Sequence, residues 1–270
     1  MTITATPTPN PLRIYLRHIR LHILSQLEYR GWWLMMLQTL VVAATDILAA
    51  FLLSARFGAV GDWTLERIVL VYALAVTAFG IAESFYRGFD SFPWRMIRSG
   101  GFDRLLLRPC SLTVQVAASF FHLHRLPRVA LGLGLIFWSL SRMGVMLTLP
   151  RVLLLIITLL GGAALYCGVF VLCAGIAFFT VKALDWMYIL QNASYQVTRC
   201  PVPHLPGTLR AVFTFVMPML LVSYYPASAL CGWGEPLWAG LLALPAGAAF
   251  YAAAMGIWRI GVRHYASTGS

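Results

Sequence analysis

Six apolar stretches, each about as long as a membrane is thick, alternate with short polar segments along this chain. About 20 apolar residues in a helix cross the roughly 30 Å hydrocarbon core of a bilayer. Of the 270 residues, 60% are hydrophobic and 11% are charged, whereas soluble domains carry about 25% charged residues. The sequence therefore predicts an all-α integral membrane protein with six transmembrane helices. The expected spans are residues 33–55, 66–83, 127–146, 151–180, 208–228 and 236–258.

The basic residues are distributed unevenly between the two ends of these spans. If the N-terminus lies in the cytoplasm, sixteen of the twenty lysine and arginine residues fall on the cytoplasmic side. Because short loops rich in these residues stay inside, both termini are expected to be cytoplasmic. The net charge of +11 is then explained by topology and by contact with anionic lipid, so nucleic-acid binding is not expected.

Residues 1–31 are expected to precede the membrane domain as a disordered tail and an amphipathic helix. Between residues 11 and 30 an apolar stripe recurs at helical spacing beside a stripe of arginines. This pattern indicates a helix lying in the inner membrane surface. Anchoring in lipid and contact with a cytoplasmic partner both remain open. The stripes are Leu12, Leu16, Ile19, Ile23 and Leu27, and Arg13, Arg17 and Arg20.

The expected membrane domain covers residues 32–258, and residues 259–270 form a cytoplasmic tail. Small residues gather in the fourth and sixth spans, for example Gly161 and Gly247. Such residues let helices approach closely. They indicate either packing between helices of one subunit or contact between subunits.

Residues 88–109 form a compact basic segment between the second and third spans. Asp90 or Ser91 can cap a short helix whose first turn tolerates Pro93. Gly100 or Gly101 can end that helix in a left-handed cap, and a second short helix can follow. A helix held at both ends by spans moves with them, which is the geometry that a motor domain needs. A solvated basic loop is the alternative reading.

The sequence resembles the permease subunits of type-2 ATP-binding-cassette (ABC) exporters, in particular a bacterial branch formerly of unknown function. The resemblance is carried by the 88–109 segment with its ending GFDRLLLRP, and by CPVPHLPGTLRAVFTFVMPMLLVSYYPASALCG at residues 200–232. It implies a permease of the bacterial inner membrane that exports hydrophobic or cationic small molecules, such as drugs. It also implies a cytoplasmic coupling helix that sits in a cleft of an ATPase. The residues expected to couple to that ATPase are Phe92, Pro93, Trp94, Arg95, Arg98, Asp103, Arg104 and Arg108.

The chain contains no nucleotide-binding loop of its own. A P-loop needs a lysine that meets the nucleotide phosphates, and the one lysine, Lys182, follows no glycine-rich loop. The chain is therefore expected to be a transport subunit without an enzyme site or a cofactor. The resemblance implies that a cytoplasmic ABC ATPase dimer binds ATP and Mg. It also implies a second permease subunit, for which a related heteromeric partner is favoured over a homodimer.

Asp46 falls inside the first expected span, roughly 13 Å from its outer end at about 1.5 Å per residue. A carboxylate at such depth is costly and usually faces the interior of the bundle. It is either a structural polar clamp or part of a path for a cationic amphiphile. Tyr224 and Tyr225, at the exit of the fifth span, are further candidates for the substrate path. Residues 223–229 either end that span or are re-entrant.

Two other classes of membrane protein fit the sequence less well than an exporter. A secondary transporter commonly shows an inverted repeat, and none is visible between the two halves of the sequence. A membrane-embedded lipid-modifying enzyme needs converging acid, base or nucleophile residues at one depth, whereas the acidic residues here are few and scattered. His122 and His124, just before the third span, are interpreted as an interfacial anchor, with a metal or proton-relay role as the alternative.

Overall fold

The computed structural model describes residues 11–28, 30–57, 63–97, 100–108, 110–180, 202 and 205–265. Within this part the chain forms helices and turns and no β-strand. The helices are α1 (Pro11–Glu28), α2 (Trp32–Phe57), α3 (Leu65–Phe92), η1 (Pro93–Ile97), α4 (Phe102–Leu106), α5 (Leu112–Ala118), η2 (Leu123–Arg125), α6 (Leu126–Arg142), α7 (Leu149–Ile176), α9 (Gly207–Ala211), η5 (Val212–Val216), η6 (Leu220–Val222), α10 (Tyr224–Cys231), α11 (Leu237–Leu241) and α12 (Ala243–His264).

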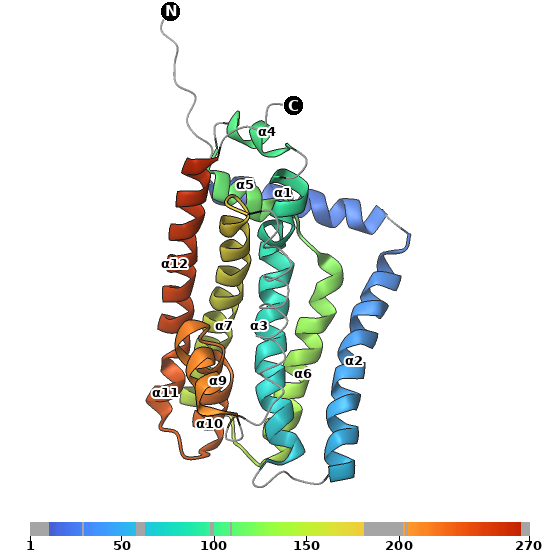
Figure 1. Ribbon diagram of the computed structural model, residues 1–270. Coiled ribbons are helices and arrows are strands. Elements are labelled where there is room, and N and C mark those ends of the chain that lie inside the picture. Colours follow the sequence, from blue (N-terminus) through green and yellow to red (C-terminus); the bar gives the residue numbers. More distant parts are fainter. Residues whose placement is uncertain are drawn as a thin grey trace, which may run out of the picture.

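The long helices stand side by side, and α1 lies across one end of the bundle (Figure 1). We call this the α1 end. The opposite end, where α9, α10 and α11 gather, is called the α10 end. The last turns of α12 reach the α1 end as well, so α1 and the end of α12 lie on the same side of the bundle (Figure 1). This agrees with an even number of crossings.

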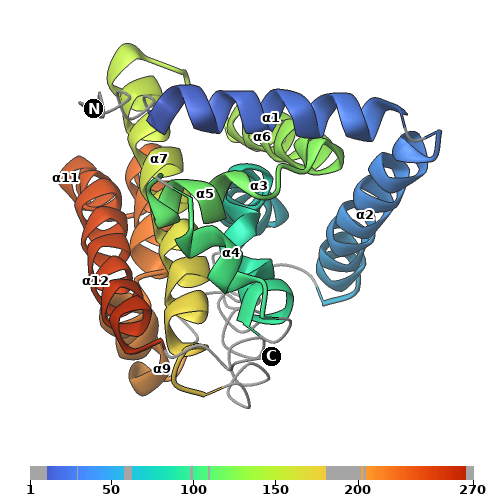
Figure 2. The same cartoon turned by 90° about the horizontal axis from the view of Figure 1, so that it is seen from above.

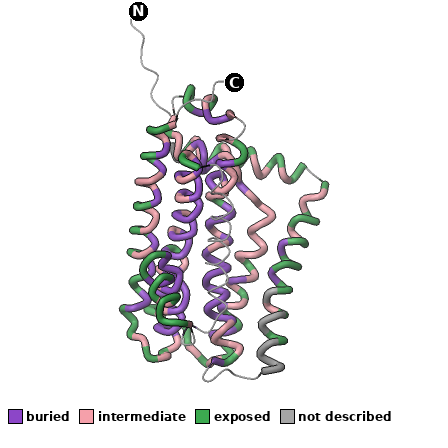
Figure 3. The backbone as a smooth tube through the Cα atoms, viewed as in Figure 1, coloured by how far each residue is buried: buried purple, intermediate pink, exposed green. Residues whose placement is uncertain are grey.

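Three helical segments are long and apolar enough to cross a membrane, namely Leu65–Ile97, Leu149–Ile176 and Leu237–His264. They confirm helices at the second, fourth and sixth expected spans. The core runs along α3 and α7, which carry more buried residues than any other helices (Figure 3). Leu74 and Phe170 are fully buried there. The protein is therefore a multi-pass membrane protein whose central helices are shielded from lipid by the others.

Helices α2 and α6 coincide with the first and third expected spans. Helix α6 has 17 residues, and α2 lies at the edge of the bundle, away from α11 and α12 (Figure 2). Many side chains of α2 are exposed, among them Leu37, Leu48 and Phe51. Apolar side chains on an outer helix are what a lipid-facing surface requires.

The fifth expected span, 208–228, is not one straight helix. Two segments, Gly207–Val216 and Leu220–Cys231, meet at an angle of 68°. Pro218 lies at the break, and the residue before a proline is driven out of the helical region; Met217 accordingly has φ −121° and ψ 91°. Both segments lie at the α10 end (Figure 1), which favours the re-entrant alternative.

The position of α9 also corrects the charge distribution expected from the sequence. The sixteen basic residues counted on the side of the N-terminus include Arg210, but α9 lies at the α10 end (Figure 1). The reason is the break near Pro218, which keeps both short segments at one end instead of carrying the first across the bundle.

The small residues of the fourth and sixth expected spans form the contact between α7 and α12. A Cβ on Gly161 would overlap the carbonyl oxygen of Ala243, and one on Gly247 would overlap the carbonyl oxygen of Gly161. Glycine is therefore required where these two backbones touch. The interpretation that these residues pack helices within one subunit is confirmed.

Helix α1 contacts the bundle through a stripe that differs from the expected apolar one, although it includes Ile19 of that stripe. Tyr15, Ile19, His22 and Gln26 are half-buried, and the Tyr15 hydroxyl donates a hydrogen bond of 2.7 Å to the carbonyl oxygen of Phe85. The leucines of the expected apolar stripe lie largely outside, as do its arginines. A helix with apolar and basic residues both exposed suits the surface of a membrane.

Candidate functional site

The helix of the second span continues into the 88–109 segment without a break. Helix α3 runs to Phe92, and η1 extends it as a wider π-turn. Pro93 has no N–H for the carbonyl of Phe89 four residues earlier, and a wider turn relieves the clash with that carbonyl. Gly100, with φ 67°, then turns the chain toward α4. The left-handed end predicted at Gly100 is confirmed.

The helix start expected at Asp90 or Ser91 is wrong, because both side chains are engaged inside α3. The Ser91 hydroxyl donates to the carbonyl oxygens of Arg87 and Gly88, each at 3.3 Å. The Asp90 carboxylate lies 3.4 Å from the Arg87 guanidinium. A serine that bonds back to the preceding turn sits within a helix rather than at its cap.

Two phenylalanines fix the 88–109 segment to the rest of the bundle. Phe92 and Phe102 are fully buried, and their rings lie 5.3 Å apart in an edge-to-face arrangement. The ring centroid of Phe92 also lies 4.9 Å from that of Trp258 in α12. Such ring pairs add about 0.5–1.5 kcal/mol each beyond the area they bury. The aromatic cluster consists of Phe92, Phe102, Phe178, Trp258 and Tyr265.

The other expected coupling residues lie on the surface or near it. Pro93 is buried, Trp94 is 39% exposed, and Asp103 is half-buried in the first turn of α4. Arg104 and Arg108 are exposed. Arg98 lies outside the described residues.

Arg95 is exposed, and its guanidinium lies over the ring of Phe120, 4.4 Å from the ring centroid. This cation–π contact connects η1 to the loop between α5 and η2. The same loop is fixed to α1 by Gln26, whose amide donates to the carbonyl oxygen of Phe121 at 2.5 Å and accepts from the N–H of Leu123 at 3.0 Å. The 88–109 segment is thus linked to α1 through a single loop.

A buried carboxylate lies just below this loop. The side chain of Glu83 is 3% exposed and pairs with Arg87, Arg125 and Arg128. The distance is 2.9 Å to Arg128 and 3.5 Å to Arg125. Glu83 and Arg87 have the i,i+4 spacing that brings two side chains together on one helix face. The arginines beyond the 88–109 segment were missed, because nothing in the sequence indicates that residues 42 or 45 positions apart meet.

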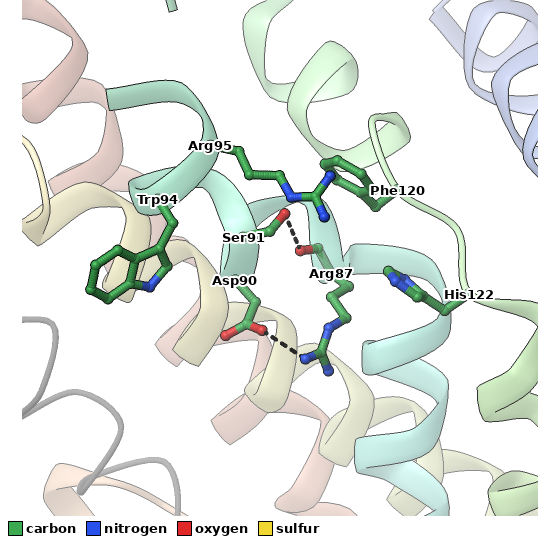
Figure 4. A pocket seen from close by; sticks show the side chains of 7 residues that line it. All are labelled: Arg87, Asp90, Ser91, Trp94, Arg95, Phe120 and His122. Carbon is green, nitrogen blue, oxygen red and sulfur yellow. Dashed lines mark hydrogen bonds and ion pairs between the residues drawn. The ribbon is translucent and has the colours of Figure 1, made fainter. Parts of the chain in front are cut away.

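A cavity of about 270 Å³ opens between the end of α3 and this loop. Figure 4 shows the guanidinium of Arg95 against Phe120 on one side, and the Arg87–Asp90 pair on the other. The lining residues are Arg87, Asp90, Ser91, Trp94, Arg95, Phe120 and His122. No motif in the sequence marks this cavity, which forms from two segments about 30 positions apart.

His122 lies in this loop with its Nδ1 atom buried and without a hydrogen-bond partner in the described part of the chain. Burial, followed by the charges of Arg87 and Arg125, lowers the pKa of His122 to about 3. The ring is therefore neutral at pH 7. Its centroid lies 5.1 Å from that of His124, and among the described residues these two belong to no group of three potential metal ligands.

The expected substrate-path residues lie elsewhere. Tyr224 is buried and stacks on Trp63 with ring centroids 5.9 Å apart, while Tyr225 is half-buried beside it. They belong to an aromatic group at the α10 end in which Arg67 lies 5.0 Å from the ring centroid of Trp233. The side chain of Asp46 lies outside the described part, and its helix α2 is on the other side of the bundle (Figure 2).

Comparison with protein families gives one match. A family model described as "ABC-2 family transporter protein" matches residues 40–269, which is most of the chain. Comparisons with curated proteins and with solved structures give no match.

Proposed function

The chain belongs to the ABC-2 transporter family, and from that premise we propose that it is the permease subunit of an ATP-driven exporter. The subunit forms a translocation path, and separate ATPase subunits supply the energy. The observation that carries this proposal is the rigid connection of the 88–109 segment to two membrane helices. The segment continues α3 directly, and the aromatic cluster joins it to α12.

The 88–109 segment acts as the coupling element. Its buried residues, Phe92, Pro93 and Phe102, hold it to the bundle. Its accessible residues, Trp94, Arg95, Arg104 and Arg108, are available to a cytoplasmic partner. Arg98 and Asp103 complete the expected contact. Because Phe92 and Trp258 touch, a displacement of the segment moves the end of α12 with it.

The α1 end faces the cytoplasm in this proposal. The exposed arginines of α1, η1 and α4 gather there, as the positive-inside rule requires. Helices α2, α3, α6, α7 and α12 account for five of the six expected crossings.

The partners are a cytoplasmic ABC ATPase dimer, which binds ATP and Mg, and a second permease subunit. We favour a related, unlike second permease over a homodimer. The setting is the bacterial inner membrane, with α1 in contact with the lipid surface.

The proposed substrates are hydrophobic or cationic small molecules. Asp46 lies within an otherwise apolar run of α2, and a carboxylate in that setting attracts a cationic ligand. Asp46→Asn is expected to impair export of cationic dyes more than that of neutral ones. Equal impairment of both would assign Asp46 a structural role.

Co-purification tests the coupling proposal. The tagged chain, extracted from its own membrane, is expected to retain a soluble protein with a Walker lysine. Arg95→Glu combined with Arg98→Glu should weaken that association, because it reverses two charges of the 88–109 segment. The control is Arg13→Glu with Arg17→Glu, which reverses two exposed charges of α1.

Equal loss of the ATPase from both double variants would assign the effect to overall charge. Transport by the purified chain alone in proteoliposomes, without ATP or another protein, would contradict the exporter proposal.

A further inference from the structure

The cavity beside the end of α3 has the chemistry of an anion site. Two of its lining residues, Arg87 and Arg95, carry guanidinium groups, and Ser91 contributes a hydroxyl. Its volume of about 270 Å³ is about nine times the roughly 30 Å³ that one water molecule takes up in the liquid. A phosphate group with part of its hydration shell therefore fits inside.

The charges around the cavity leave a positive excess. Asp90 lines it, and Glu83 lies behind it, but four arginines surround these two carboxylates: Arg87, Arg95, Arg125 and Arg128. Glu83 pairs with three arginines, Arg87, Arg125 and Arg128. Its negative charge is therefore already compensated inside the protein. The guanidinium of Arg95 lies at the rim of the cavity, over the ring of Phe120.

His122 supplies independent support on the opposite wall. Its buried Nδ1 atom makes no hydrogen bond within the described part of the chain, and buried polar atoms normally find a partner. The neighbouring arginines contribute to the low pKa of this ring, which indicates a positive local potential. An anion in the cavity would complete the hydrogen bonding of His122 and offset that potential.

The cavity lies at the level of the membrane surface. Helix α1 lies across the ends of the spans in both views (Figures 1 and 2), and Gln26 fixes it to the loop that forms one cavity wall. The exposed leucines of α1, such as Leu16 and Leu24, suit the boundary between acyl chains and headgroups. Phosphates of lipids occupy that same depth, whereas α4 lies farther out (Figure 1).

We propose that this cavity binds the phosphate of an anionic phospholipid, such as phosphatidylglycerol, between Arg95, Ser91 and His122. Arginine suits this role because its planar guanidinium donates two parallel hydrogen bonds to phosphate. The bound headgroup would lie between η1 and the loop that connects to α1, so lipid composition would influence how firmly the 88–109 segment is held.

Lipid retention by the purified chain, without any ATPase, tests this proposal separately from the exporter function. The chain is reconstituted in nanodiscs of phosphatidylcholine and phosphatidylglycerol, and the retained lipid is measured by native mass spectrometry. Wild type is expected to retain phosphatidylglycerol preferentially. Arg95→Gln should weaken that retention about tenfold, the factor that corresponds to about 1.4 kcal/mol.

Two further variants make the result specific. Arg104→Gln removes one exposed charge from α4, outside the cavity, and is expected to retain lipid like wild type. Ser91→Leu fills the cavity without changing the charge and should also reduce retention, which covers the case that Arg95→Gln does not fold. Gel filtration checks the folding of each variant.

Equal retention of phosphatidylglycerol by wild type, Arg95→Gln and Ser91→Leu would overturn the proposal. Equal losses for Arg95→Gln and Arg104→Gln would also overturn it, because general surface charge would then explain the binding. Displacement of the lipid by inorganic phosphate at matching concentration would reassign the cavity to free phosphate and overturn the lipid assignment.

Discussion

The carboxylate of Glu83 accepts a hydrogen bond of 2.9 Å from the guanidinium of Arg128, and this contact joins α3 to the start of α6. The same carboxylate pairs with Arg87 on its own helix and lies 3.5 Å from Arg125 of η2. Three segments of the chain therefore converge on one buried negative charge. Removing one member of such a network is costly, because it leaves opposite charges buried without compensation.

Glu83→Gln is expected to destabilise the protein by about 3–5 kcal/mol, the usual cost of breaking a buried ion pair from one side. The neutral amide keeps the size of the side chain but cannot balance three guanidinium groups. The thermal unfolding midpoint in detergent measures the effect. Glu28→Gln, an exposed position of α1, is the control and should leave the midpoint unchanged. Matching midpoints for the two variants would show that the network contributes little.

Gly247→Ala is expected to loosen the contact between α7 and α12 at a cost of about 1–3 kcal/mol. The new methyl group would meet the carbonyl oxygen of Gly161, and backbone atoms cannot move aside as a side chain can. Gly256→Ala on the same helix is the control, because a Cβ there meets nothing within 4 Å. Thermal midpoints distinguish the two. A destabilised Gly256→Ala with an unchanged Gly247→Ala would contradict the observed contact.

Phe178→Ala is expected to weaken the attachment of the 88–109 segment to α12. The ring centroid of Phe178 lies 5.4 Å from those of Phe92 and Phe102 and 5.3 Å from that of Trp258. Removing such a ring lowers the free energy of unfolding by about 3–5 kcal/mol. Its neighbour Phe179 is 51% exposed, so Phe179→Ala should cost far less.

Two measurements check this pair of variants: the thermal midpoint and the transport obtained per ATP hydrolysed by the assembled transporter. Phe178→Ala should lower both. An unchanged transport ratio in a destabilised Phe178→Ala variant would show that the aromatic cluster stabilises the fold without transmitting movement.

Acidification is expected to destabilise the protein partly through His122. The pKa of its ring is about 3 in the folded protein and about 6.5 in an unfolded chain. Between about pH 6.5 and about pH 3 the ring binds a proton in the unfolded chain but not in the folded protein. The free energy of unfolding therefore falls as the pH drops below about 6.5. The slope stays under the limit of about 1.4 kcal/mol per pH unit, because one ring differs by at most one bound proton between the folded and unfolded states.

Thermal midpoints of wild type and His122→Gln, measured across this pH range, isolate the contribution of this ring. The pKa values of His124 and His22 are also lowered by burial, so wild type and variant share the remaining slope. The variant should show the flatter profile. Parallel profiles would exclude His122 as the titrating group.

The hydropathy of the sequence sufficed to place three spanning helices. Its signals are local, since a run of about 20 apolar residues is itself a spanning helix. The contact of α7 with α12 was visible as small residues, but the choice between contact within a subunit and contact between subunits depends on which helix faces which. That choice required the structure.

The sequence did not predict the continuation of α3 beyond Glu83 or the break in residues 208–228, and the two reasons are opposite. The charged residues after Glu83 suggested a loop, yet Arg87 and Asp90 pair with one another inside a continuing helix. Conversely, the uninterrupted apolar run at 208–228 suggested one span, although Pro218 breaks it. In both cases the prediction followed the average composition of the stretch, whereas the structure depends on one local feature. That feature is the Arg87–Asp90 pair in the first case and Pro218 in the second. The cavity beside Arg95 was out of reach because its walls come from separate segments.

The segment from Leu65 to Ile97 is one helix of 33 residues, about 50 Å long at about 1.5 Å per residue. That exceeds the hydrocarbon thickness of about 30 Å, so roughly 20 Å of the rod stands clear of the acyl chains. In the proposed exporter, an ATPase that displaces the α1-end tip of this helix would tilt the whole helix, and its other end, beside Arg67, would move in the reverse direction.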